Sequence, residues 1–566
     1  MTNLNPTLIT TLLAVACLLT QPLTSLSSTE LANILDLSMP GTANQIMYNA
    51  DANDARVSGS QLAQSAAIGD VNGDGINDLL IGVPAAQGPD NRRQSAGEVL
   101  IFFGRAGPGG GTIIRDAAMP SPPTGSGADV IIYGPVVGLL GISVAAADLN
   151  GDGIDDIIAG ALGATKRDPG GGRPVPSAGA VFVVFGSTEL ASGTRLDLAA
   201  EDEAGAGLRV FGAHLASLAG QAVAAGDVNG DAIADLIIGA PGTNKGGSAR
   251  AFGAAYVVFG GAALAGFRDL GATPSSGRGA DVVVFGADAA GRTSGDQLGV
   301  GVASGDVNGD HIDDLIVSAP LADGPANQRR DAGEVYVFFG GPGLTSGTAV
   351  DLAQTSASVR IHGAAQDDQL GFSLGTGDLN GDGTSDLLMG ATGRDSAAGE
   401  DAGAVYVVFG GRTLTSGLSR DLNQAAPPSA NGADVLISGP GRRSSFGISL
   451  ASGDVNGDRV ADLVVGAEQA TNRAGVATGL MYVFYGSAAL TSGRVLDAAA
   501  PAPPQGNGAH VVILGVNEGD MLGFDVAAGD VNDDGIADLL MAAPGGDGPN
   551  DGRPGAGETY LVLGER

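Results

Sequence analysis

A nine-residue Asp-rich segment recurs seven times along the chain, and its residue types are those of a cation site. Each copy has Asp at its first, fifth and ninth positions and Asn at its third. These side chains supply only oxygen ligands, and the backbone carbonyl of the seventh position adds another within one tight turn. Oxygen-only sites of flexible geometry are typical of Ca²⁺, whereas zinc and copper prefer histidine or cysteine. The pattern therefore predicts one calcium site in each copy, up to seven in all.

The predicted ligands occupy positions one, three, five, seven and nine of each copy, the seventh through its carbonyl oxygen. In chain order they are Asp70, Asn72, Asp74, Ile76, Asp78; Asp148, Asn150, Asp152, Ile154, Asp156; Asp227, Asn229, Asp231, Ile233, Asp235; Asp306, Asn308, Asp310, Ile312, Asp314; Asp378, Asn380, Asp382, Thr384, Asp386; Asp454, Asn456, Asp458, Val460, Asp462; and Asp530, Asn532, Asp534, Ile536, Asp538.

An ordinary turn and an EF-hand are the two alternatives to this kind of calcium loop. Asp, Asn and Gly form turns without any ligand, and one isolated copy would be compatible with that role alone. Seven copies that all keep three carboxylates are not, because the charges repel one another without a cation. An EF-hand is excluded, since it needs Glu at position twelve, where the first copy has Ile81. Position six is Gly in four copies, and we expect strain at Ala232, His311 and Arg459 in the others.

Four short strands are predicted around each Asp-rich segment. In the fifth copy they lie at residues 370–375, 386–390, 404–410 and 433–438, which are rich in β-branched or aromatic residues and bounded by Gly or Asp. The copies start 72 to 79 residues apart. Seven four-stranded antiparallel units at this spacing predict an all-β, seven-bladed β-propeller.

The two ends of the chain predict how the ring closes. The seventh copy stops after its third strand, 558–564, while an unassigned strand at 44–49 precedes the first copy and follows an Asp-Leu pair that also precedes fourth strands elsewhere. We expect this strand to complete blade seven. The predicted divisions are a signal peptide at 1–28, an N-terminal segment at 29–57, and blades at about 58–134, 135–212, 213–286, 287–363, 364–439, 440–515 and 516–566.

Composition and the N-terminus predict a secreted or cell-surface protein. The apolar run at 8–19 is too short to span a bilayer and fits the core of a signal peptide, with a lipid anchor at Cys17 as a variant. No other segment approaches transmembrane length. A net charge of −34 disfavours nucleic acid as a partner, and a single Cys excludes intrachain disulfides.

The chain resembles the FG-GAP repeats of the integrin α-subunit N-terminal β-propeller. The resemblance rests on Phe372, Phe446-Gly447 and Phe524 before the Asp-rich segments, and on Gly239-Ala240-Pro241 after one of them. It implies the propeller fold and calcium in the loop between first and second strands. The regularity of all seven loops favours a bacterial, propeller-only relative. Leg domains and a transmembrane helix are not found, so an integrin β-subunit partner is not implied.

Partner binding is expected through the loops between second and third strands. We predict a face for an acidic glycan or protein; the alternative is that the basic residues only keep these loops soluble. The basic residues in these loops are Arg92, Arg93, Lys166, Arg167, Arg173, Lys245, Arg250, Arg329, Arg330, Arg394, Arg473 and Arg553.

The expected function is that of a calcium-binding extracellular adhesion or ligand-binding module. A polysaccharide-binding or polysaccharide-cleaving propeller is the alternative. No enzyme is expected, because cleavage needs a positioned base, and two Lys and four scattered His offer no repeated candidate.

Overall fold

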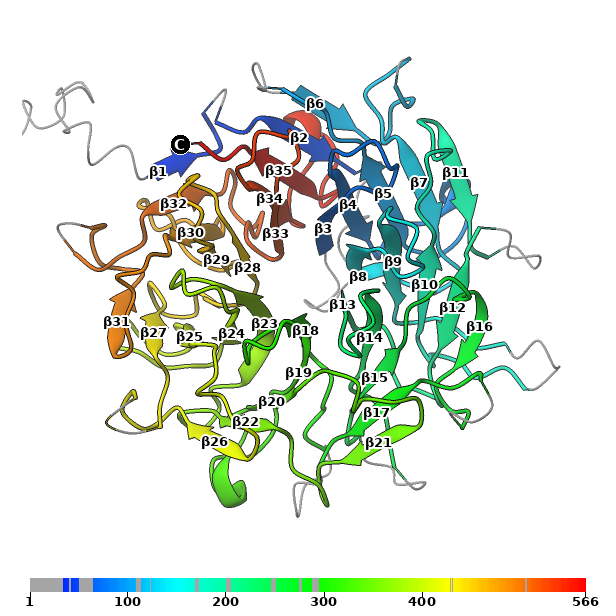
Figure 1. The fold of residues 1–566 in the computed structure, drawn as a ribbon. Coiled ribbons are helices and arrows are strands. Elements are labelled where there is room, and N and C mark those ends of the chain that lie inside the picture. The colour runs from blue at the N-terminus through cyan, green and yellow to red at the C-terminus, as the bar shows by residue number, and fades with distance from the viewer. Residues whose placement is uncertain are drawn as a thin grey trace, which may run out of the picture.

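Seven β-sheets stand around a central axis in the computed structural model (Figure 1). The structure describes residues 34–39, 42–49, 65–107, 113–122, 124–167, 173–199, 205–245, 251–273, 277–287, 295–427, 429, 431–503 and 506–565. The signal peptide predicted at 1–28, and Arg250 among the basic loop residues, lie outside this part of the chain. Among the described residues, no helix is both long and apolar enough to cross a membrane.

Each blade contributes four antiparallel strands, numbered outward from the axis. They are β3 (Ser65–Gly69), β4 (Asp78–Val83), β5 (Glu98–Phe102) and β7 (Val130–Tyr133) in blade one; β8 (Leu140–Ala147), β9 (Asp156–Ala161), β10 (Ala180–Val184) and β12 (Leu208–Phe211) in blade two; β13 (Ala222–Gly226), β14 (Asp235–Ala240), β15 (Ala254–Val258) and β17 (Val282–Phe285) in blade three; and β18 (Val302–Gly305), β19 (Asp314–Ala319), β20 (Glu334–Phe338) and β22 (Val359–His362) in blade four. Blade five has β23 (Leu370–Gly377), β24 (Asp386–Ala391), β25 (Ala404–Val408) and β27 (Val435–Ser438); blade six has β28 (Leu450–Gly453), β29 (Asp462–Ala467), β30 (Leu480–Phe484) and β32 (Val511–Leu514); and blade seven has β33 (Val526–Gly529), β34 (Asp538–Ala543), β35 (Glu558–Val562) and β2 (Gln45–Tyr48).

The propeller prediction is confirmed, but every sheet has five strands rather than the predicted four. The fifth strand runs parallel to the fourth at the rim and comes from the next repeat, where it lies in the connection between third and fourth strands. This strand covers an edge that would otherwise expose unpaired backbone groups. The outer strands of blades one to seven are β11 (Thr194–Asp197), β16 (Gly266–Asp269), β21 (Thr348–Asp351), β26 (Leu418–Asp421), β31 (Arg494–Asp497), β1 (Ile34–Asp36) and β6 (Ile113–Asp116).

The N-terminal segment closes the ring as predicted. Strand β2 pairs antiparallel with β35, with Met47 opposite Thr559, and so supplies the fourth strand of blade seven. Strand β1 pairs parallel with β32 and supplies the outer strand of blade six. In Figure 1 these blue strands lie beside the red C-terminal blade. The Asp-Leu pair that pointed to closure lies at the end of β1, just as it lies at the end of β21 and β26.

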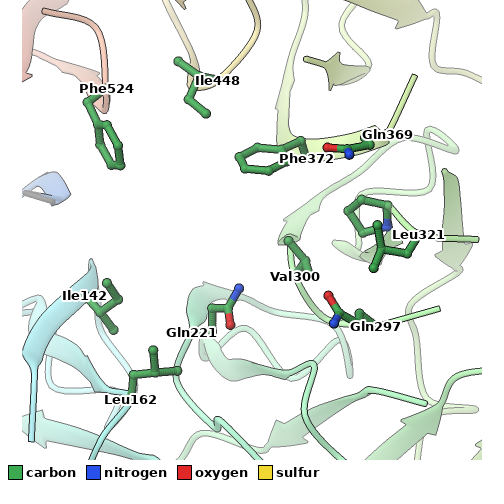
Figure 2. Close-up of a pocket in the computed structure, with 11 residues that line it drawn as sticks. Ile142, Leu162, Gln221, Gln297, Val300, Leu321, Gln369, Phe372, Ile448 and Phe524 are labelled. Atoms are coloured by element: carbon green, nitrogen blue, oxygen red, sulfur yellow. The ribbon is translucent and has the colours of Figure 1, made fainter. Parts of the chain in front are cut away.

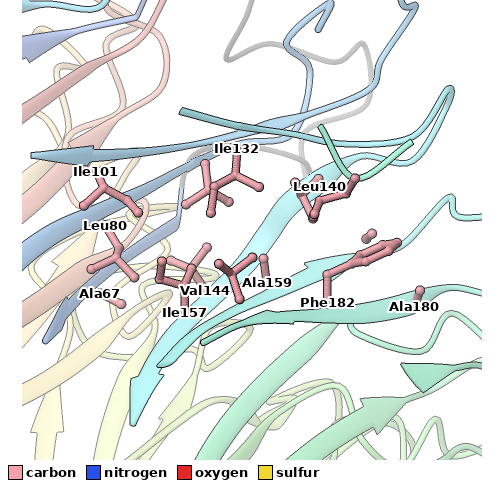
Figure 3. Close-up of a cluster of buried hydrophobic side chains, with 14 of the residues drawn as sticks. Ala67, Leu80, Ile101, Ile132, Leu140, Val144, Ile157, Ala159, Ala180 and Phe182 are labelled. Atoms are coloured by element: carbon pink, nitrogen blue, oxygen red, sulfur yellow. The ribbon is translucent and has the colours of Figure 1, made fainter. Parts of the chain in front are cut away.

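The hydrophobic core consists of seven clusters, each between two neighbouring blades. Figure 3 shows the cluster between blades one and two, where Leu80 and Ile101 face Val144 and Phe182. No blade therefore has a core of its own, and stability depends on an unbroken ring. Three short 3-10 helices, η2 (Pro89–Asn91), η4 (Pro325–Asn327) and η5 (Pro549–Asp551), lie in the loops after the second strands of blades one, four and seven.

Candidate metal centre

The seven Asp-rich segments form the loops between first and second strands, so they lie together on one face of the ring. In blade one the loop follows β3 and ends with Asp78, the first residue of β4. The strands are antiparallel, and the loops between second and third strands therefore lie on the opposite face. We call these the Asp face and the opposite face.

The first Asp of each loop organises the turn. In blade one, Asp70 Oδ2 accepts a hydrogen bond from the backbone N–H of Gly75 at 2.8 Å, and Oδ1 accepts one from Gly73 at 2.8 Å. The bond from position six to the first Asp is present in all seven loops, at 2.7 to 2.8 Å. The carboxylate is thus held with both oxygens inside the turn.

The fifth and ninth Asp are held by equally regular contacts. In blade one, exposed Asp74 accepts a hydrogen bond from the N–H of Ile76 at 3.0 Å. Asp78 is fully buried and accepts hydrogen bonds from the N–H groups of Val71 at 3.1 Å and Gly104 at 2.9 Å. Equivalent contacts occur in all seven loops.

The ninth-position carboxyls have raised pKa values. Burial is the main cause, hydrogen bonds from backbone N–H groups oppose it, and the charges of the other Asp residues in the loop add to it. The pKa is raised to about 7 in six loops and to about 6 in the seventh, at Asp78, Asp156, Asp235, Asp314, Asp386, Asp462 and Asp538 respectively.

Neighbouring loops are connected to one another around the ring. The backbone N–H of Asp155, at position eight of loop two, donates to the carbonyl of Asp70 in loop one at 3.0 Å. Position eight makes the same bond between four further pairs of loops, and the Asn77 side chain donates to the carbonyl of Asp530 at 2.8 Å, which links loop one to loop seven. The position-seven side chain also overlies the fourth-position glycine of the preceding loop, as Ile154 does at Gly73.

The seventh loop differs from the other six at its third position. In the first six loops the Asn side chain donates to the ninth Asp, at 2.9 to 3.3 Å. In loop seven the Asn532 side chain is 4% exposed, and neither its oxygen nor its nitrogen has a partner among the described residues. Asp533 replaces the glycine at position four and adopts φ 60°.

The residues present fit a hard cation by donor chemistry, because every candidate ligand atom is an oxygen. The orphaned Asn532 amide is a second sign of fit, since a buried polar group without a partner is costly. Within the described part of the chain, however, no three carboxylate, imidazole or thiol side chains are gathered into a ready metal cluster. The structure therefore places the predicted ligands of each loop in one turn without testing calcium itself.

The strain predicted at position six is present. Ala232, His311 and Arg459 adopt φ values of 69°, 69° and 72°, in the left-handed region that favours glycine. The glycines at this position have φ values of 79° to 86°.

A family model for the FG-GAP repeat matches seven segments: residues 62–102, 140–184, 219–258, 298–338, 370–408, 446–484 and 522–562. The chain belongs to the FG-GAP repeat family. Each match begins near the first strand of a blade and ends with its third strand, so the Asp loop lies inside every FG-GAP segment.

Curated relatives of this FG-GAP protein fall into two groups. Integrin alpha-PS2 of Drosophila melanogaster is 33% identical over 181 residues, which is 31% of this chain and 12% of the relative. Integrin alpha-8 of Gallus gallus is 28% identical over 258 residues, 44% of this chain and 20% of the relative. Phosphatidylinositol-glycan-specific phospholipase D of Bos taurus is 28% identical over 248 residues, 44% of this chain and 26% of the relative. The FG-GAP chain thus matches about a quarter or less of the length of each.

The basic residues of the opposite face have a structural role in this FG-GAP propeller that was not predicted from the sequence. Arg329, in the loop between second and third strands of blade four, makes two hydrogen bonds of 2.7 Å to Asp421, the last residue of outer strand β26. We call such a pair, between this loop and the outer strand of the same sheet, a rim clasp. Five sheets have one: Arg93–Asp197, Lys166–Asp269, Lys245–Asp351, Arg329–Asp421 and Arg553–Asp116.

A repeated sequence signal marks the acidic half of the rim clasps. Each acidic partner is the last residue of an outer strand, and in four of the five clasps it is the Asp of an Asp-Leu pair. That signal could have identified these residues before the structure did. Four of the remaining basic residues, Arg92, Arg167, Arg173 and Arg473, are exposed.

Proposed function

We propose that this chain is a calcium-binding extracellular β-propeller that acts as an adhesion or ligand-binding module, with a structural Ca²⁺ in each blade. The observation that carries the proposal is the repetition of one arrangement seven times: three carboxylates in one turn, on one face, in loops that hydrogen-bond to their neighbours. The ligands would be the positions named from the sequence. Bound ions would neutralise the carboxylates and hold the loops that join the blades.

An extracellular location fits the charge and the chain's lack of disulfide partners. Low-affinity calcium sites fill at the millimolar concentrations found outside cells and stay largely empty in the cytosol. A protein with a net charge of −34 and a single Cys would gain from cations the constraint that secreted proteins often obtain from disulfides. The apolar run at 8–19 remains a prediction of export.

We propose a binding role rather than a catalytic one. The phospholipase D relatives are matched over 18 to 26% of their length, so their activity is not carried over to this chain. Ligands would approach the opposite face, where exposed Arg92, Arg167, Arg173 and Arg473 lie in loops rather than in rim clasps.

The test is thermal unfolding of the calcium-loaded protein, with and without excess EGTA, together with counting of bound ions by native mass spectrometry. We expect a large fall in Tm on chelation, full recovery with millimolar Ca²⁺, and about seven ions, since each site contributes roughly 2.7 kcal/mol at a hundredfold excess over Kd. Asp74→Ala should remove one ion. Glu189→Ala, which removes one exposed charge outside the loops, should remove none. An unchanged Tm would reduce the loops to ordinary turns.

A further inference from the structure

A depression of about 390 Å³ opens at the axis of the ring on the opposite face. Six of its lining side chains occupy one equivalent position, at the start of the first strand in blades two to seven. Each follows a glycine of positive φ, and the strand then runs across the ring to the Asp face. These six are Ile142, Gln221, Val300, Phe372, Ile448 and Phe524, and Figure 2 shows them around the central opening.

The lining carries no charged side chain. Its other members are Leu162, Gln297, Pro320, Leu321 and Gln369. In a chain with 62 Asp and Glu residues and a net charge of −34, an uncharged axial surface contrasts with the rest of the molecule. A charged ligand group would lose its hydration there and find no counter-charge. The lining therefore favours an uncharged ligand.

Three carboxamides supply the polar groups of the depression. Gln221, Gln297 and Gln369 come from blades three, four and five, and their side chains make no hydrogen bond within the described residues. A Gln side chain offers two donors and one acceptor with two lone pairs. Three such groups around one opening suit a ligand that both donates and accepts many hydrogen bonds.

Two aromatic rings supply the apolar part. Phe372 and Phe524 are partly exposed, and Figure 2 shows both beside the opening, with Ile448 between their blades. A pyranose has an apolar face of C–H groups that packs on an aromatic ring, and an edge of hydroxyls that hydrogen-bonds to carboxamides. The volume lies in the range of small-molecule sites, which combine mostly apolar walls with a few polar groups.

We propose that the axial depression binds one or two neutral pyranose units of a glycan. The inference rests on the proposed ligand-binding function, because it names the ligand class of that module. Phe372 and Phe524 would pack against the sugar faces, and the three Gln side chains would bind hydroxyls. A uronate is disfavoured by the absence of a cation in the lining.

The test is saturation-transfer NMR of the protein in millimolar Ca²⁺ with methyl glycosides of glucose, galactose, mannose, xylose and N-acetylglucosamine, and with methyl glucuronide as the charged counterpart. We expect at least one neutral glycoside to bind with Kd in the range of about 1 mM, and the glucuronide to bind at least about tenfold more weakly. Phe372→Ala should weaken binding of the neutral glycoside roughly tenfold. Gln366→Ala, an exposed glutamine outside the depression, should leave it unchanged.

A second variant guards against misfolding of the Phe372 variant. Gln221→Glu alters a partly exposed side chain and should weaken binding about threefold or more, at an unchanged Tm. No signal from any neutral glycoside at about 20 mM overturns the proposal. So does binding that survives both variants, or equal binding of the glucuronide, or displacement of nothing but a bound apolar peptide. Chelation on the same samples reports on calcium separately, so the two proposals fail independently.

Discussion

At the level of single residues, position six of the Asp loops offers a reciprocal experiment. Ala232 adopts φ 69° there, whereas Gly383 adopts φ 86° with no atom within 4 Å of the place that an added Cβ would occupy. Ala232→Gly should stabilise the protein and Gly383→Ala should destabilise it, each by about 1 kcal/mol, because a side chain is strained at positive φ. Urea unfolding at saturating Ca²⁺ measures both.

Gly343 provides the matched control for this pair. It also has no atom within 4 Å of an added Cβ, but its φ lies outside the left-handed region. Gly343→Ala should therefore cost nothing measurable. Equal effects at Gly343 and Gly383 would show that the φ values of the loops do not limit stability.

A buried Glu at the start of the third strand occurs in blades four and seven, with opposite titration. Burial raises the pKa of Glu558 to about 7. Burial also acts on Glu334, but hydrogen bonding and charge from His362, at 2.7 Å, together with the charge of Arg360, hold the pKa of Glu334 below its usual value. The difference follows from the partner strand, which places Tyr48 opposite Glu558 and His362 opposite Glu334.

These two directions predict opposite dependence of stability on pH. The folded state holds the Glu558 proton more tightly than the unfolded state, so the free energy of unfolding should fall as pH rises from about 4.5 to about 7. Glu558→Gln should remove that fall and stabilise the protein at pH 8. Glu334→Gln should destabilise it at pH 8, because the stabilisation from ionised Glu334 is present above pH 4.5. Urea unfolding at pH 5 and pH 8 in constant Ca²⁺ measures this, and the same sign for both variants would contradict it.

At the level of elements, the rim clasps fasten each sheet to a strand from the next repeat. Arg329 donates to both oxygens of Asp421 and to the carbonyl of Gly363 at 2.6 Å, and the Arg329 hydrogen bonds lower the pKa of Asp421. A double-mutant cycle with Arg329→Ala and Asp421→Ala should give a coupling of about 1–3 kcal/mol at pH 7. The coupling should fade as pH falls below 3.8, where Asp421 becomes protonated.

The exposed pair Arg442–Glu400 is the control for this cycle. Its side chains are 58% and 69% exposed, against 22% and 18% in the clasp. Its coupling should stay below about 0.5 kcal/mol. Equal couplings for the two pairs would reduce the clasp to an ordinary surface ion pair.

The elements also show how far the sequence predicted the structure. The four inner strands and the Asp loops could be predicted, because each is a short apolar run between Gly and Asp repeated at one spacing. Outer strands such as β16 and β21 could not, since they have four residues, lie at the rim and pair with a different repeat. The axial depression could not be predicted either, because its equivalent position holds Ile142, Gln221 and Phe372 in different blades. Its chemistry arises only when the ring brings these side chains together.

At the level of the whole molecule, stability depends on closing a ring whose cores lie only between blades. The N-terminal segment 34–49 supplies β2 to blade seven and β1 to blade six. Met47 is 1% exposed within the cluster between blades seven and one, and Leu37 is 5% exposed in the cluster between blades six and seven. Asn44 further accepts a hydrogen bond from the N–H of Leu563 at 2.9 Å, which joins both ends of the described chain.

Deleting residues 34–49 should therefore lower Tm by at least about 10 °C, because it removes a sheet strand and opens two adjacent cores. Deleting only 34–39 removes the outer strand β1 and should cost much less, since β2 still completes blade seven. Met47→Ala tests the same core without changing the chain length, and should cost about 2–5 kcal/mol. Calorimetry in millimolar Ca²⁺ compares the three. If the longer deletion melted like the intact protein, the ring would not need its N-terminal strand, and the stability of the propeller would have to reside in single blades.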